Sequence, residues 1–205
     1  MNLSNTFFSL AAARLYFAGL FLLPTALVIS AVVPLQATKM MIAAVALIGA
    51  LAFAVFGAFK RGGLSLPLNW LLGAVWLLPI TYLVSSVFSL SFQWSLLGAQ
   101  LDMDTVVFVV LLALASSLPF FIFSGKADTT RAFLVLLVAS WVVAAFHLIR
   151  LFVGPEILSF GIFTNPLFSP LGKWNDVSIF FGLVSLLTLV TLESLPLQAP
   201  QRYIL

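Results

Sequence analysis

Residues 62–101 read GGLSLPLNWLLGAVWLLPITYLVSSVFSLSFQWSLLGAQL, which is 40 consecutive residues without Asp, Glu, Lys or Arg. A helix that crosses a bilayer needs about 20 predominantly apolar residues, because each residue adds ~1.5 Å along the helix axis. The stretch is therefore long enough for one membrane-spanning helix and an apolar connection after it. It predicts a chain embedded in a membrane.

The rest of the chain has the same character. Further charge-free stretches occupy 15–38, 40–59, 105–125, 132–149 and 177–192. The 205 residues are 63% hydrophobic and 7% charged, whereas a soluble domain carries roughly 25% charged residues. This composition excludes a soluble globular domain and a disordered chain. Because the apolar stretches do not alternate with a period of two, they predict an all-α, polytopic transmembrane helical bundle of about six spans.

The stretches divide a single domain, 1–205, into spans and connections. The expected spans are about 15–33, 40–59, 67–89, 105–123, 132–153 and 177–194. The short connections Lys60–Leu66 and Ser124–Thr130 predict tight helical hairpins, and residues 90–104 are expected at the membrane interface because they are apolar and contain Trp. The last three residues, Tyr203-Ile204-Leu205, look like the start of another span, so we expect a fragment of a longer chain.

Positive charges predict the orientation, because Lys and Arg concentrate on the cytoplasmic side. With a cytoplasmic N-terminus, the inner side receives six of them: Arg14, Lys60, Arg61, Lys126, Arg131 and Arg202. The outer side receives three: Lys39, Arg150 and Lys173. The count favours an N-in, C-in arrangement.

Several classes of function are excluded by what the sequence lacks. The positive charges lie singly at the ends of apolar stretches, apart from the pair Lys60-Arg61, so no basic face predicts a nucleic-acid partner. There is no cysteine, which removes disulfides and thiolate chemistry. No Walker loop, G-x-G-x-x-G or H-E-x-x-H motif occurs. We therefore expect no cofactor and no metal, and a lipid bilayer as the main partner.

A stripe of small residues marks the second span. It consists of Ala46, Ala50, Ala54 and Ala58. Alanine at every fourth position lets a neighbouring helix approach closely, and close packing is the main attraction between helices in lipid. The stripe predicts either packing within the chain or a seam between two copies.

The candidate substrate-binding residues lie near the expected outer surface. His147 is the single histidine, and Arg150 follows one turn later on the same helical face. Ionisable residues are costly inside a membrane span, so their presence there suggests a functional role. Lys173, Trp174 and Asn175 precede the last span, where Lys can attract phosphate and Trp can stack on a sugar. The alternatives are that Arg150 extends to the interface and that Asn175 or Asp176 caps the last helix.

Two segments resemble a known family. They are residues 76–89, WLLPITYLVSSVFS, with the following SFQWSLLGAQLDMDT, and residues 165–193, NPLFSPLGKWNDVSIFFGLVSLLTLVTLE. Together they resemble the N-terminal half of O-antigen ligase-like membrane proteins, which are lipid-linked glycan ligases and polymerases. The resemblance covers about residues 65–195.

The resemblance implies metal-independent glycosyl transfer from a polyprenyl-diphosphate donor in a bacterial inner membrane. This chain would supply scaffold and part of a lipid groove for polysaccharide biosynthesis. The family's catalytic arginine and histidine belong to a large outer loop in its second half, so the resemblance assigns no catalytic residue here. The alternative is a non-enzymatic membrane module, such as a transporter subunit or an assembly protein packing through the alanine stripe.

Overall fold

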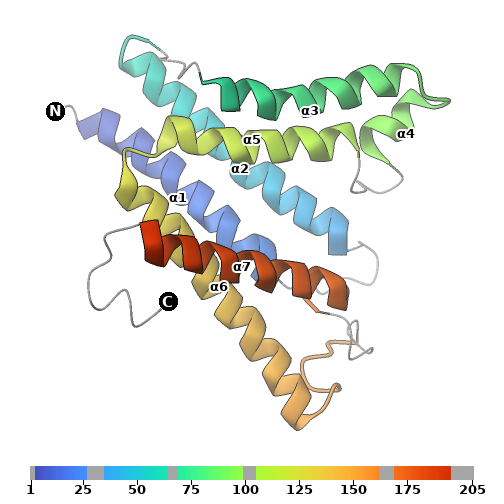
Figure 1. The fold of residues 1–205 in the computed structure, drawn as a ribbon. Helices are drawn as coiled ribbons and strands as arrows, with labels where there is room; N and C mark the ends of the chain where they lie inside the picture. The colour runs from blue at the N-terminus through green and yellow to red at the C-terminus, as the bar shows by residue number, and fades with distance from the viewer. Residues whose placement is uncertain (1–2, 27–34, 64–68, 99–104, 162–168, 195–205) are drawn as a thin grey trace. The chain divides into compact units, whose positions relative to one another are not determined.

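The computed structural model describes residues 3–26, 35–63, 69–98, 105–161 and 169–194. Within these ranges the regular secondary structure consists of α-helices (Figure 1). The helices are α1 (Leu3–Thr25), α2 (Leu35–Lys60), α3 (Trp70–Val87), α4 (Phe92–Leu97), α5 (Val106–Ile122), α6 (Lys126–Val153) and α7 (Trp174–Ser194). Among the described residues, five helices are long and apolar enough to cross a membrane, and α5 is a shorter apolar helix of 17 residues. The prediction of an all-α, multi-spanning protein is confirmed.

Several predicted boundaries are wrong by one turn or more. α1 begins at Leu3, not near residue 15, so Arg14 lies exposed in the middle of a helix. Lys39 lies within α2 and is buried, not in a connection. α6 begins at Lys126, so the predicted turn Ser124–Thr130 is mostly helical. Hydropathy locates the lipid-compatible part of a helix, whereas the hydrogen-bonded backbone continues through polar residues until a cap or a turn ends it.

The chain forms two compact units. Unit 1 contains Met1–Gly19 and Gln36–Phe123, and unit 2 contains Leu20–Leu35 and Ser124–Leu205. The single domain remains a prediction.

In unit 1, α1 and α2 pack closely through small residues. A methyl group added at Gly19 would lie 2.7 Å from Cβ of Ala46. One added at Gly57 would lie 3.2 Å from Cβ of Phe8, near the opposite ends of both helices. The two helices are therefore antiparallel. Ala46, Ala50 and Ala58 are buried and Ala54 is half-buried, so the alanine stripe packs within the chain.

Polar side chains also join the helices of unit 1. The Trp76 indole Nε1 donates a hydrogen bond of 3.0 Å to Oγ of Ser117, linking α3 to α5. Tyr16 on α1 donates a bond of 3.0 Å from its hydroxyl to the carbonyl of Ala115 on α5. Bonds of this kind contribute about 0.6 kcal/mol each between helices in lipid. They select which faces meet, because lipid itself does not distinguish one apolar face from another.

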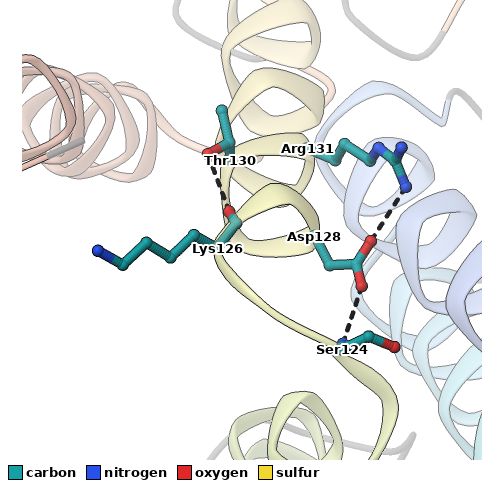
Figure 2. A network of polar contacts seen from close by, with 5 residues as sticks. All are labelled: Ser124, Lys126, Asp128, Thr130 and Arg131. Atoms are coloured by element: carbon teal, nitrogen blue, oxygen red, sulfur yellow. Dashed lines mark hydrogen bonds and ion pairs between the residues drawn. The ribbon is translucent and has the colours of Figure 1, made fainter. Parts of the chain in front are cut away.

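In unit 2, a carboxylate organises the start of α6 (Figure 2). Asp128, in the first turn, accepts a hydrogen bond of 2.9 Å from the backbone N–H of Ser124. Its other oxygen accepts one of 3.0 Å from Nη1 of Arg131. An acidic residue at this place satisfies an otherwise unpaired donor and interacts favourably with the helix dipole. Asp128 therefore sets where α6 begins.

Candidate functional site

A tight turn positions the start of α7. Ser169 and Gly172 exchange two backbone hydrogen bonds, of 2.9 and 3.0 Å, and Oγ of Ser169 accepts a third bond from the N–H of Leu171. Ser169 is fully buried. Ser, Pro and Gly occupy the first, second and fourth positions of the turn, which is the sequence that such turns favour. The turn delivers Lys173 and Trp174 directly to the helix N-terminus.

Asp176 caps this helix from its third position. Its Oδ2 accepts a hydrogen bond of 2.8 Å from the backbone N–H of Lys173, the residue just before α7. This is the reach-back half of a capping box. The alternative that Asn175 is the N-cap is therefore wrong, because α7 begins at Trp174 and Asn175 already lies in its first turn. Lys173, Trp174 and Asn175 are all exposed.

His147 on α6 meets Trp174 on α7. Their ring centroids lie 6.2 Å apart with an edge-to-face angle of 66°. Nδ1 of His147 lies 2.8 Å from the carbonyl oxygen of Val143. A carbonyl only accepts, so Nδ1 carries a proton, and in neutral imidazole Nε2 is then the acceptor. Two parts of the predicted site, 27 residues apart in sequence, are thus in contact.

Arg150 has a structural role in this arrangement. Its Nε and Nη2 donate hydrogen bonds of 3.2 and 3.0 Å to the carbonyl of Pro155, in the turn that follows α6. The guanidinium carbon lies 5.5 Å from the centre of the Phe146 ring. The side chain is buried within the protein. It holds the end of α6 against the following turn.

A groove of about 580 Å³ runs along α6 and α7. Leu137, Trp141 and Ala144 line it on the α6 side, and His147 continues this helical face one turn beyond Ala144. On the α7 side, Phe181 lies two turns after Trp174. The remaining lining residues are Ser140, Val184, Ser185, Thr188, Leu189 and Leu192. The lining of the groove ends at Ala144 on α6 and Phe181 on α7. The contact between His147 and Trp174 lies one turn beyond it on α6 and two turns beyond it on α7.

Sequence patterns do not indicate this groove, although they single out His147 and Trp174. Its residues are ordinary members of two apolar spans, and only the antiparallel pairing of α6 with α7 brings them together. A periodic search backwards from His147 by three and seven residues would have found Ala144 and Ser140. Among the described residues, no group of three or more His, Asp or Glu side chains is arranged to hold a metal ion.

We compared the chain with known protein families, curated proteins and solved structures. No family model, no curated protein and no solved structure matches this chain.

Proposed function

We propose that the groove between α6 and α7 binds a polyprenyl-diphosphate-linked glycan, as the resemblance to O-antigen ligase-like proteins implies. The prenyl chain would lie along the groove and the diphosphate beside Lys173, in a bacterial inner membrane. This chain would then hold the donor lipid for glycosyl transfer. No residue of the chain is assigned a catalytic role.

The observation that carries this proposal is the groove between α6 and α7, with the contact between His147 and Trp174 one to two helical turns beyond its lining. A lipid with a long apolar chain and an anionic headgroup needs an apolar channel that ends at polar and cationic side chains. Lys173 supplies an exposed ammonium at this end, and ammonium groups bind phosphate as point charges. Because the Asp176 carboxylate occupies the N–H of Lys173, the helix terminus itself is not the anion site.

The alternative of a module that assembles through the alanine stripe loses its main support. Ala46 of the stripe makes a close approach to Gly19 of α1 in the same chain, and Ala50 and Ala58 are buried within it. A second copy would have to displace α1 to use it. We therefore favour the lipid-binding function.

Binding of undecaprenyl diphosphate tests the proposal. The chain is reconstituted in phosphatidylcholine nanodiscs, and affinity is measured by competition with a fluorescent prenyl diphosphate. Lys173→Gln should weaken binding about tenfold, which corresponds to ~1.4 kcal/mol. Ala144→Leu should also weaken it, because a larger side chain fills the groove.

The matched control is Lys126→Gln, which removes another exposed lysine of unit 2, at the opposite end of α6. This variant should bind like the parent chain. Equal effects of the two lysine substitutions, or equal affinity for undecaprenol without its diphosphate, would contradict the proposal.

A further inference from the structure

A second cavity lies in unit 1, and most of the residues that line it carry a hydroxyl group. It has a volume of about 390 Å³, within the range of small-molecule sites. Seven described residues line it: Thr81, Tyr82, Ser85, Ser86, Ser89, Ser95 and Val106. Six of the seven carry a hydroxyl, which is unusual between apolar helices in a membrane protein, where polar groups are costly and mark function.

The cavity lies where three helices meet. Its lining comes from the last two turns of α3, from Ser89 two residues after that helix, from the short helix α4 and from the first residue of α5. α3 packs side by side with α5, and α4 contacts both (Figure 1). The cavity is therefore at the end of the candidate span Trp70–Val87. A polar ligand can enter it there from water.

Most of its hydroxyl protons are already used. Ser86 donates to the carbonyl of Leu83 at 2.7 Å, and Thr81 donates to that of Leu78 at 2.8 Å. Ser89 likewise donates to the carbonyl of Ser86. Each of these oxygens keeps lone pairs that can accept a hydrogen bond. The cavity thus presents mainly acceptors.

Two further hydroxyls add donors. Within the described part of the chain, the side-chain hydroxyls of Tyr82 and Ser85 have no hydrogen-bond partner, and the Tyr82 ring adds an aromatic surface. Ser95 and Ser89 are linked by a bond of 2.8 Å between their oxygens, which holds α4 against the end of α3. The result is a cavity with several acceptors, two donors and one aromatic face, and its seven lining residues carry no charge.

We infer that this cavity binds the ring of a neutral sugar, whose hydroxyls both donate and accept and whose C–H face packs on an aromatic ring. Among the seven described lining residues, an anionic headgroup would find no cation and an ammonium group would find no carboxylate. The sugar can belong to a glycolipid headgroup or to a free saccharide. The inference rests on the α3, α4 and α5 contacts alone and does not depend on the proposed function.

Protection of a single thiol tests it. The chain has no cysteine, so Ser85→Cys, at an exposed position of the cavity, introduces a unique thiol whose labelling by a maleimide is followed in phosphatidylcholine nanodiscs. Methyl β-glucoside tests a free sugar, and monoglucosyl diacylglycerol in the nanodisc tests a glycolipid. Labelling should slow about fivefold at a ligand concentration about four times the dissociation constant.

Leu90→Cys, at a fully exposed position that does not line the cavity, is the control thiol and should be labelled at an unchanged rate. Adding Tyr82→Phe to Ser85→Cys should reduce the protection, whereas adding Ser116→Ala, an exposed hydroxyl of α5 outside the cavity, should not. Protection by the glycolipid alone assigns a lipid headgroup, and protection by both probes assigns the sugar itself. Protection by neither probe, or protection that Tyr82→Phe leaves unchanged, overturns the inference.

Discussion

At the scale of single residues, the start of α7 shows that a shift of one position along the chain decides which side chain caps the helix. Asn175 and Asp176 are both good capping residues by type. The backbone decides between them, because the helix begins at Trp174 and only Asp176 reaches the N–H of Lys173. Asn175 is left exposed, near the proposed lipid headgroup.

Asp176→Ala should lower the stability of the chain by about 1 kcal/mol, because it removes a capping hydrogen bond and a favourable charge near the helix dipole. Unfolding in mixed micelles with increasing SDS measures this change. Asn175→Ala serves as the control and should stay within about 0.5 kcal/mol of the parent. A larger loss for Asn175→Ala than for Asp176→Ala would return the cap to Asn175.

Gly172 is the second residue-scale case. Its φ of +130° lies where L-amino acids are strained, and an added Cβ would lie 2.5 Å from Oδ2 of Asp176. Gly172→Ala should therefore destabilise the turn and displace the Asp176 cap, at a cost of about 1–3 kcal/mol. Gly182→Ala is the control, because a Cβ there meets nothing within 4 Å. Similar unfolding midpoints for the two variants would contradict this account.

At the scale of elements, stability comes from close packing and from a few interhelical hydrogen bonds. The packing of α1 on α2 distinguishes members of one alanine stripe. Ala50 is fully buried, whereas Ala54 is half-buried. Equal spacing in sequence therefore does not mean equal burial.

Ala50→Leu should destabilise the helix pair by ~1–3 kcal/mol, by analogy with overpacked cores. Ala54→Leu should cost less, because its side chain has room on one side. Thermal unfolding in detergent compares the two variants. If both unfold like the parent, α2 does not use this face for packing.

The bond between Trp76 and Ser117 makes a separate prediction for α3 and α5. Trp76→Phe removes the indole donor and should cost about 0.6 kcal/mol beyond the lost contact area. A double-mutant cycle with Ser117→Ala isolates this coupling, and Trp94→Phe, an exposed tryptophan of α4, controls for the change of ring. A coupling of zero would mean that the bond adds nothing to the pairing.

At the scale of the whole molecule, orientation in the membrane is the main open prediction. The count of positive charges places Lys126 in the cytoplasm and Lys173 outside. Because the chain has no cysteine, Lys126→Cys and Lys173→Cys give single thiols for labelling in intact cells. A membrane-impermeant maleimide should label position 173 only. External labelling of position 126 would reverse the topology and the placement of the proposed lipid headgroup.

The fold class could be predicted from composition, because a bilayer accepts only backbones whose polar groups are bonded internally and long apolar stretches satisfy this as helices. The span at 105–123 matches α5 within one residue at each end, since Thr105 provides a cap that can be recognised in sequence. The start of α1 could not be predicted in this way. Its apolar part begins at Phe7, before Arg14, and a search for charge-free stretches ends at Arg14 although the helix continues through it.

For the candidate site too, some features could be predicted from the sequence and others only from the tertiary structure. Residue types alone singled out His147, Trp174 and Lys173, because aromatic and ionisable side chains stand out in an apolar chain. Only the tertiary structure assigned Arg150 to the carbonyl of Pro155, joined Ala144 and Phe181 into a groove and gathered six hydroxyls around one cavity. In lipid, every apolar face is equally compatible with its surroundings, so which faces meet depends on close packing and paired hydrogen bonds. That information exists only when two helices are placed side by side.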